Sequence, residues 1–500
     1  MKYFRFSSSF SKIFIFHFSV LVAGSANTPE DFLECLVTNV SNSTTTHEPI
    51  FYSSNDSLYS SVLNSSIRNH RFSSPSTPKP SVIVTPSHVC HVHATVYCSK
   101  KHGMQIRIRN GGHDAEGLSY VSYFNGPGFV VINLRNLNLV SVDVESKSAW
   151  VQAGATLGEL YYTIGEKIEN LGFPAGDCHS VGVGGQIGGG GYGYLTRKYG
   201  LAADNILDAE LVDAEGRILD RKSMGEDLFW AIRGGGPASF GIVLAWKVRL
   251  VPVPSTVTVF DVWRNMEHDA TKKFVHRWQH RANKVDEDLT ICVTFQTFAS
   301  SKIHHKDKGK NSTEIVVKAN VRGTFHGGVD RLLELMQREF PELGLERQEC
   351  SEMRLYEEDV GRAVISAFPY GGKMNVILES AIPFSHRAGN LYMIYYMVRW
   401  EEEEEEEKPV SWLRKLYNDM TPYVSQNPRA TYFNFRDLDI GTNNLNEGDT
   451  TSITQASIWG IKYFKNNFCI LIQVKTSVDP TNFFINEHII PPLLNYALKM

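Results

Sequence analysis

The chain has 500 residues, of which 42% are hydrophobic and 21% are charged, and its formal net charge is −4. This length and composition indicate a globular protein of two or three domains. The small negative charge is not the footprint of a nucleic-acid-binding protein, and no stretch beyond the N-terminal region is long and apolar enough to span a membrane.

Residues 1–26 are predicted to be a secretory signal peptide. Lys2, Arg5 and Lys12 flank an apolar run over residues 13–24, and small residues up to Ala26 offer a cleavage site. The run is too short for a membrane span and fits a cleaved leader. We therefore expect a secreted protein.

The region behind the leader carries a cluster of Asn-x-Ser/Thr sequons, and one more lies further along. We expect N-glycosylation at Asn39, Asn42, Asn55, Asn64 and Asn311. The chain has 7 cysteines, so at least one has no intrachain disulfide partner.

Short helices and strands alternate through the first half of the chain. Strands are expected at residues 80–86, 105–109, 129–134, 148–155, 207–217 and 240–243. Helices are expected at residues 29–37, 88–102, 156–171 and 227–233. This alternation predicts α+β sheets built around a ligand.

A boundary is expected at residues 252–254, where two prolines flank a valine. Beyond it we expect a second domain of strands at 257–260, 288–298 and 314–323 with helices at 272–285 and 328–340. The lysine-rich segment 300–311 reads as a hairpin tip, and the glutamate run 401–407 as a solvated segment. Residues 412–424 are predicted helical, and the aromatic-rich segment 432–439 is predicted to be a strand or loop.

The most unusual stretch is 176–193, in which eight of the twelve residues from Gly182 to Gly193 are glycine. So many glycines make a poor helix or strand interior. Interleaved apolar residues such as Val183 and Ile187 do not suit a solvated linker. We infer a backbone packed against a flat or phosphorylated ligand, the alternative being a purely structural glycine turn. Cys178 stands at the entrance of this stretch.

A second ligand-binding turn is predicted after the strand at 105–109. There, residues 110–114 read Asn-Gly-Gly-His-Asp, so backbone N–H groups can form a nest for a diphosphate, with Arg107 or Arg109 adding charge. His113 follows the two glycines directly, and its neighbours favour a functional role. A further glycine site at 234–236 runs into the strand that begins after Gly241.

These motifs together closely resemble the plant berberine bridge enzyme-like family of secreted FAD-linked oxidoreductases. The resemblance spans residues 31–493 and rests on segments 107–114, 174–178, 181–185, 234–241, 432–439 and 478–484. It implies an α+β, vanillyl-alcohol-oxidase-like fold with a PCMH-type FAD-binding domain of two α+β subdomains. It also implies a substrate domain whose antiparallel sheet is backed by helices. The implied division is 27–255 for the FAD-binding domain (core 76–252), 256–425 for the substrate domain, and 426–500 for a C-terminal segment returning to the FAD domain.

The resemblance implies FAD bound covalently twice, with His113 linked to the flavin 8α-methyl group and Cys178 to C6. Cys35 and Cys98 match the family's disulfide, whereas Cys90 is not a usual family position. No metal is expected. The other residues implied to bind the cofactor are Arg109, Asn110, Gly111, Gly112, Asp114, Ser119, Val181, Gly182, Gly184, Gly185, Gly241 and Ile242.

The implied activity is hydride transfer from a small alcohol, sugar or specialised metabolite to FAD, and then to O2 to give H2O2. Val181, three residues after the linking cysteine, resembles oxygen-reactive members and favours an oxidase. The expected partners are therefore a small-molecule substrate and O2. The protein is expected to be a monomer in the extracellular space or cell wall, with the vacuole as the alternative.

The chain also departs from the family pattern. Ala115 and Phe435 stand where many members have tyrosines, which leaves Tyr192, Tyr395 and Tyr432 as phenols that are either the base or an aromatic wall. Family members are several dozen residues longer between Cys350 and Pro369. These departures keep open the alternative of a catalytically weak or inactive flavoprotein acting as a cell-wall or binding glycoprotein.

Overall fold

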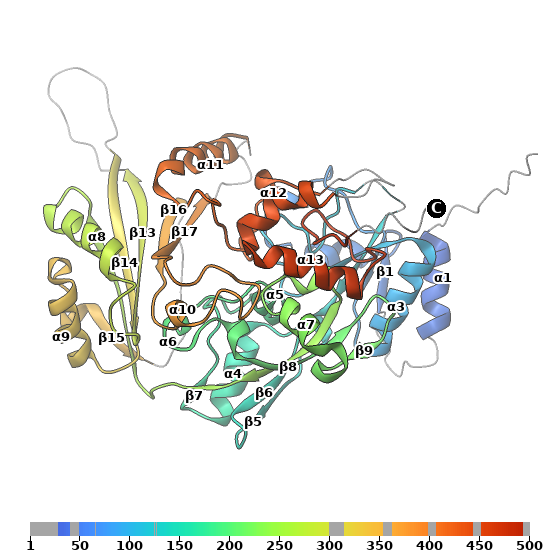
Figure 1. The fold of residues 1–500 in the computed structure, drawn as a ribbon, viewed down its shortest axis with the longest axis horizontal. Helices are drawn as coiled ribbons and strands as arrows, with labels where there is room; N and C mark the ends of the chain where they lie inside the picture. The colour runs from blue at the N-terminus through green and yellow to red at the C-terminus, as the bar shows by residue number, and fades with distance from the viewer. Residues whose placement is uncertain are drawn as a thin grey trace, which may run out of the picture.

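The computed structural model describes residues 29–40, 50–65, 67–124, 126, 128–299, 315–353, 363–398, 407–443 and 452–493. The predicted signal peptide, the sequons at Asn42 and Asn311, and the predicted hairpin tip lie outside these residues. Figure 1 shows two parts side by side. One holds the sheets of the first half together with the last helices, and the other holds the sheet of the second half.

The first sheet has four strands in the order β1-β2-β4-β3, with β4 parallel to both β2 and β3. Its strands are β1 (Phe51–Ser53), β2 (Val82–Val84), β3 (Gln105–Arg109) and β4 (Phe129–Asn133). All residues of β2 and β4 are buried, as expected for short apolar strands inside a parallel sheet. Helices α1 (Pro29–Val40) and α3 (Val89–His102) are joined by the disulfide Cys35–Cys98, which confirms that expected pairing.

The second sheet is antiparallel, with the strand order β5-β6-β10-β8-β9. Its strands are β5 (Val140–Asp143), β6 (Ser148–Gln152), β8 (Ile206–Val212), β9 (Ile218–Leu219) and β10 (Ile242–Arg249). Two helices, α4 (Leu157–Lys167) and α7 (Arg221–Ile232), pack beside it. A capping box starts α4, because Thr156 and Glu159 satisfy each other's backbone N–H groups.

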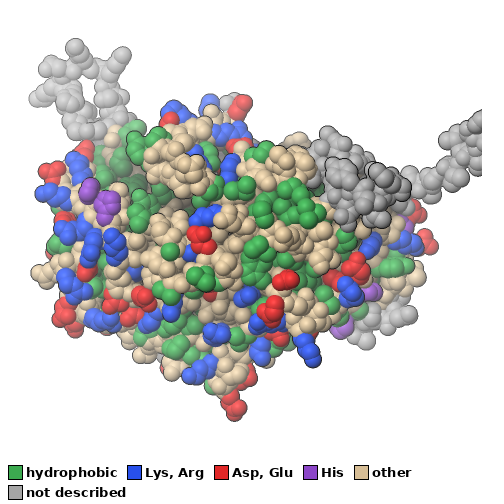
Figure 2. Space-filling view, viewed as in Figure 1, with side chains coloured by type: hydrophobic (Ala, Val, Ile, Leu, Met, Phe, Trp, Pro, Cys, Tyr) green, Lys and Arg blue, Asp and Glu red, His purple; other side chains and the backbone are tan. Residues whose placement is uncertain are grey.

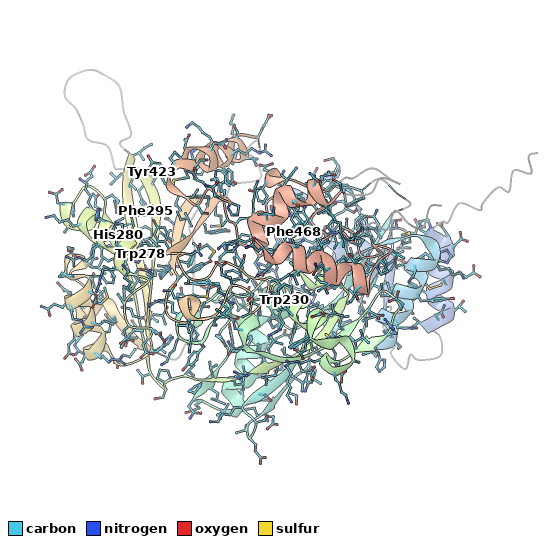
Figure 3. All side chains as sticks on the ribbon, in the orientation of Figure 1. Trp230, Trp278, His280, Phe295, Tyr423 and Phe468 are labelled. Carbon is cyan, nitrogen blue, oxygen red and sulfur yellow. A yellow bond between two sulfur atoms is a disulfide. The ribbon has the colours of Figure 1, made fainter. Side chains whose placement is uncertain are left out.

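The third sheet has six strands in the order β15-β12-β14-β13-β16-β17, all antiparallel to their neighbours. They are β12 (Val257–Asn265), β13 (Leu289–Ala299), β14 (Ile315–Phe325), β15 (Cys350–Met353), β16 (Ala363–Pro369) and β17 (Tyr392–Val398). Helices α8 (Asp269–Arg281) and α9 (Val329–Glu339) cover one face and share an apolar core with it. Trp278 and Phe295, both labelled in Figure 3, belong to this covered side.

The last two helices return to the first part of the molecule. Helices α12 (Ile453–Phe464) and α13 (Asn467–Val478) bring their buried residues into the same core as the first two sheets. Lys475 in α13 donates to the Ser239 carbonyl, and the Arg107 guanidinium pairs with Glu487. The mixed fold with antiparallel and parallel sheets confirms the predicted α+β class.

The glycine stretch differs from its expected form, because α5 (Val183–Gly188) makes a short helix inside it. Val183 and Ile187 are both fully buried there, so packing stabilises a helix that glycine propensity alone would not support. Figure 2 shows acidic and basic side chains interspersed over the visible face, in keeping with the small net charge. None of the described helices is long and apolar enough to cross a membrane.

Candidate functional site

A continuous cavity of about 2920 Å³ lies between the two parts of the molecule. A pocket for one small ligand is about 300–1,000 Å³, so this space suits a large cofactor together with a substrate. Its lining comes from the turn after β3, the glycine stretch, the uncovered face of the third sheet, and the aromatic segment 431–439. The cavity therefore brings together motifs that lie far apart in the sequence.

His113 and Cys178 meet around one hydroxyl in this cavity. His113 Nε2 lies 3.0 Å from Ser180 Oγ, and Cys178 Sγ lies 3.6 Å from the same oxygen. Both side chains are exposed toward the cavity that they line. Desolvation by the surrounding cavity walls lowers the pKa of His113 even though part of its surface is open to the cavity, and the Arg68 charge contributes further. A neutral imidazole and a nearby thiol are the nucleophiles that two covalent links require.

The glycines of the two turns have different roles. A Cβ on Gly111 would lie 2.5 Å from Gly182 N, and a Cβ on Gly182 would lie 2.5 Å from Gly111 N. These two glycines therefore let the two loops touch backbone to backbone. A Cβ on Gly185, in contrast, would meet no atom within 4 Å, so this glycine borders open space.

Most of the other residues expected at the cofactor line the cavity. They are Asn110, Gly112, Asp114, Ser119, Val181, Gly184 and Gly241. Asn110 Nδ2 donates to the Ala153 carbonyl, and Asp114 Oδ1 accepts the N–H groups of Glu116 and Leu118, which closes the turn. The buried hydroxyl of Ser119 has no protein partner among the described residues, as a cofactor contact would require.

Two of the expected cofactor residues, Arg109 and Ile242, are not among the residues that line the cavity. The fully buried guanidinium of Arg109 points away from the cavity and donates to the carbonyls of Val62 and Leu63 at the end of α2 (Tyr59–Asn64). Desolvation lowers the pKa of Arg109 to about 10. Ile242 is buried in the sheet core, and the next residue, Val243, lines the cavity instead.

Tyr432 is the phenol with the most developed hydrogen-bond environment. Its oxygen accepts the backbone N–H groups of Gly191 at 2.8 Å and Tyr192 at 3.2 Å, and the amide of Asn434 at 2.9 Å. Burial raises the pKa of Tyr432 to about 12, whereas these three donors act in the opposite direction by stabilising the phenolate. Negative charge on this oxygen would find three donors already in place.

The other two expected phenols occupy different settings. Tyr192 donates its hydroxyl proton to the Pro369 carbonyl at 2.6 Å, and burial raises its pKa well above the ordinary value. Tyr395 stacks on Phe435 with ring centroids 4.5 Å apart. Both line the same cavity as Tyr432.

Ser180 is a residue of the candidate site that sequence reasoning did not single out. It lies two residues after Cys178, but only the folded chain shows that its hydroxyl faces His113. The described residues contain no group of three histidine, cysteine or acidic side chains arranged to hold a metal ion. The site thus combines a glycine-lined cradle, two nucleophiles and an unpartnered hydroxyl, which fits a covalently attached FAD.

Two family models match the chain. The model described as an FAD binding domain matches residues 80–221, and that described as berberine and berberine-like matches residues 431–491. The first covers the turn with His113 and the glycine stretch, and the second covers the segment with Tyr432. Fold and site therefore define an FAD-linked oxidoreductase.

Curated relatives and solved structures agree with this class. Cannabidiolic acid synthase-like 1 of Cannabis sativa is 47% identical, with 94% of each chain covered. Tetrahydroberberine oxidase of Berberis wilsoniae is also 47% identical, over 93% of this chain and 94% of the relative. The structure of berberine bridge enzyme-like 28 from Arabidopsis thaliana has a TM-score of 0.82 at 42% identity, covering 93% of this chain and 100% of that one.

The chain belongs to the berberine bridge enzyme-like family. Its alignment to the Cannabis sativa relative has 529 positions but covers only 94% of a 500-residue chain. The relative therefore carries several dozen residues that have no counterpart here, in keeping with the shortened segment expected between Cys350 and Pro369.

Proposed function

We propose that the protein is a secreted oxidase that carries FAD linked to both His113 and Cys178. It transfers a hydride from a small alcohol, sugar or specialised metabolite to the flavin and passes the electrons to O2, giving H2O2. The observation that carries the proposal is the approach of the two nucleophiles to the same hydroxyl of Ser180. Bound FAD would supply the hydride acceptor.

The chain's own residues would bind the substrate and move its proton. Tyr432 is the proposed proton acceptor in its phenolate form, which the three converging donors stabilise against the burial that raises its pKa to about 12. Tyr192 would orient the substrate as a wall, since its hydroxyl proton is held by the Pro369 carbonyl. Phe435, where many relatives have a tyrosine, packs at 5.3 Å from the Tyr432 ring and 4.5 Å from the Tyr395 ring.

Oxidase rather than dehydrogenase activity is proposed from Val181. This residue lines the cavity beside Cys178, and its N–H donates to the Cys178 carbonyl. Among solved relatives, a grass pollen allergen of 38% identity and TM-score 0.83 is titled a glucose dehydrogenase. A variant of that allergen in which one isoleucine is replaced by valine is titled a glucose oxidase.

The test is to purify the secreted protein, denature it, and measure flavin absorbance on the polypeptide. We expect colour to remain in the single variants His113→Ala and Cys178→Ala and to be lost only in the double variant. A colourless denatured native protein would refute the double link. Peroxide release with sugars, aromatic alcohols and benzylisoquinoline alkaloids then tests the oxidase.

The same assay distinguishes the proposed oxidase from the alternative of an inactive flavoprotein. Relatives described as an oxidase and as a dehydrogenase favour a working enzyme. Bleaching of the flavin by none of the substrates under anaerobic conditions would favour the inactive form. Secretion would be checked by N-terminal sequencing of the mature chain after residue 26 and by glycan release at the five expected asparagines.

A further inference from the structure

Helix α8 carries basic residues at regular intervals on the side that faces away from the third sheet. Its Phe274 and Trp278 are buried in the core that the helix shares with the sheet. On the outward side, two basic residues stand next to each other on each of three successive turns, and all six side chains are exposed. These pairs are Lys272 with Lys273, His276 with Arg277, and His280 with Arg281.

The six basic residues and Glu342 line a surface groove of about 550 Å³, which we call the basic groove. In Figure 2, histidines lie among lysine and arginine side chains over α8, at the left of the view. The helix has four lysines and arginines but one acidic residue, Asp269, whereas the whole chain has a net charge of −4. At about 1.5 Å per residue, the cations extend over about 14 Å of the helix axis. The groove therefore presents a line of positive charge on a slightly acidic molecule.

Two carboxylates hold the arginines of the basic groove in place without covering them. Arg277 Nη2 lies 2.7 Å from Glu342 Oε1, and Arg281 Nη2 lies 2.6 Å from Glu339 Oε2. The carboxylates are only 18% and 14% exposed, whereas the arginine side chains are 43% and 47% exposed. A guanidinium has five N–H donors, so most of them remain available to a ligand. Because the arginines are already oriented, binding loses less side-chain entropy.

The other basic residues of the groove do not suit a metal ion. Lys273, His276 and His280 form no ion pair with any residue that the structure describes, and the two imidazole rings lie edge-on with centroids 5.3 Å apart. Two histidines at this spacing could bind a metal, but the neighbouring lysines and arginines repel a cation. The described part of the chain also has no group of three metal-ligating side chains. An anion is therefore the favoured ligand.

We propose that the basic groove binds an acidic polysaccharide, a linear polymer whose sugars carry carboxylate groups. A single exposed ion pair contributes little, so a ligand must meet several of these cations at once. A polymer does so because its carboxylates are already linked. The site is separate from the proposed oxidase reaction, since no residue of α8 lines the flavin cavity. The choice of a polysaccharide rests on the proposed secretion, because carboxylated polysaccharides are extracellular polymers.

The groove is less suited to a membrane or to exposed bases. The large apolar residues of α8, Phe274 and Trp278, are buried against the sheet, so they cannot enter a bilayer as the apolar face of a membrane-surface helix does. No phenylalanine, tyrosine or tryptophan lines the groove, so it has no ring of these types on which bases could stack. Its hydrogen-bond donors and positive charges match carboxylates instead.

The experiment measures binding of the purified, flavin-loaded protein to polygalacturonate by calorimetry and by retention on the immobilised polymer. Fully methyl-esterified polygalacturonate is the uncharged control with the same backbone. We expect Kd to be about tenfold or more lower for the acidic polymer than for the ester, and monomeric galacturonate to compete weakly. Raising NaCl from about 0.05 to about 0.5 M should weaken polymer binding about tenfold or more, because exposed charges are screened.

A charge reversal in the groove has a matched control elsewhere. Lys273→Glu removes no ion pair with a described residue, and we expect it to raise Kd for polygalacturonate about fivefold or more. Lys222→Glu, at an exposed position in the first turn of α7, changes the net charge equally and should leave Kd unchanged. Both variants should keep native flavin absorbance and peroxide release, because neither residue lines the cavity.

Equal Kd values for the acidic polymer and its ester, or a Lys273→Glu variant that binds like the native protein, would overturn the inference. Tighter binding to double-stranded DNA or to phosphatidylserine vesicles than to polygalacturonate, lost in Lys273→Glu, would overturn the assignment of a polysaccharide. Failure of the proposed function gives a different result. Polymer binding without peroxide release would refute the oxidase and leave the groove in place, whereas peroxide release without polymer binding would refute the groove alone.

Discussion

Ser180 places a hydroxyl between the two groups that are proposed to join the flavin. The distances of 3.0 Å to His113 Nε2 and 3.6 Å to Cys178 Sγ let one oxygen orient both side chains. Desolvation lowers the pKa of His113, which favours the neutral imidazole with its nitrogen lone pair. The hydroxyl can therefore select which imidazole nitrogen faces the cofactor.

We expect Ser180→Ala to slow covalent attachment at His113 without preventing FAD binding. The measurement is the fraction of flavin that stays on the denatured chain, together with the total flavin of the native protein. Ser61→Ala, on the exposed side of α2, is the matched control. Full covalent loading of Ser180→Ala at the native rate would contradict this role.

Tyr432→Phe removes the acceptor of three N–H groups and the proposed proton acceptor together. We expect kcat to fall about 10²-fold or more, and the free energy of unfolding to fall by about 1–3 kcal/mol, because buried donors lose their partner. Steady-state kinetics and thermal unfolding measure the two effects. Tyr162→Phe, whose ring is 71% exposed on α4, should change neither. Native kcat in Tyr432→Phe would assign the proton transfer to another group.

At this scale the sequence motifs marked His113 and Cys178, which line one cavity in the structure, whereas the position of the Arg109 side chain could not be predicted from them. His113 and Cys178 follow glycines, and their backbone setting shows in the sequence. Arg109 leaves β3 on the same face as Arg107, two positions before it, so the strand alone does not separate their partners. Its guanidinium lies with α2, whereas that of Arg107 pairs with Glu487. No residue near position 109 in the sequence indicates that the end of α2 lies beside Arg109 in the folded protein.

Among the elements, α13 is attached to the first part of the molecule through Lys475, which also forms a buried charge pair at the end of this helix. Lys475 Nζ lies 2.7 Å from Asp479 Oδ2, both side chains have 0% exposure, and the ammonium also donates to the Ser239 and Phe484 carbonyls. Asp479 in turn accepts the N–H groups of Phe483 and Phe484. Asp479 thus binds both the last turn of α13, through Lys475, and the segment that follows the helix.

We expect Lys475→Met to lower the free energy of unfolding by about 3–5 kcal/mol, because it leaves a buried carboxylate without its cation. The chain offers a control with the same spacing. Lys415 and Asp419 are also four residues apart, but their side chains are 73% and 59% exposed. Lys415→Met should cost about 0–1 kcal/mol. Chemical denaturation of both variants measures the difference, and equal losses would contradict the role of burial.

Helices and strands with a regular pattern of apolar residues were predicted well. Helices and strands that form only because of tertiary packing were predicted poorly. The strand at 105–109 agrees with β3 at both ends, and the helix at 328–340 agrees with α9 to within a residue. The helix α5 was not predicted, because glycine opposes helix formation and only the buried Val183 and Ile187 support it. Strand β17 was also missed, because its side chains are all half-buried and show no alternation.

For the molecule as a whole, three buried histidines connect stability to pH. Desolvation lowers the pKa of His326 and His386 to about 4, and that of His488 to about 3. In the unfolded chain these histidines become protonated near pH 6.5, whereas in the folded chain they stay neutral at that pH. The contribution of these histidines to the free energy of unfolding is therefore fully present above that pH. It is lost as the pH falls toward their pKa values in the folded chain.

We expect the melting temperature to decrease steadily from pH 7 to pH 4.5. His326→Leu should reduce the slope, because each such group contributes up to about 1.4 kcal/mol per pH unit. Both ring nitrogens of His326 are buried without a protein partner among the described residues, so an apolar replacement loses no hydrogen bond. His268→Leu, on the exposed start of α8, is the control. An unchanged slope in His326→Leu would contradict this assignment.

The pairing of Arg107 with Glu487 has a consequence for the order of events during synthesis. The two residues are 380 positions apart, and Glu487 also accepts the N–H of Tyr123, so the strand leading to His113 is secured by nearly the last described segment. While the chain is still emerging from the ribosome, Arg107 cannot form its ion pair, because Glu487 has not yet been synthesised. We therefore expect the proposed flavin attachment to follow completion of the polypeptide. We expect chains stopped at residue 480 to accumulate colourless, whatever the supply of FAD during expression.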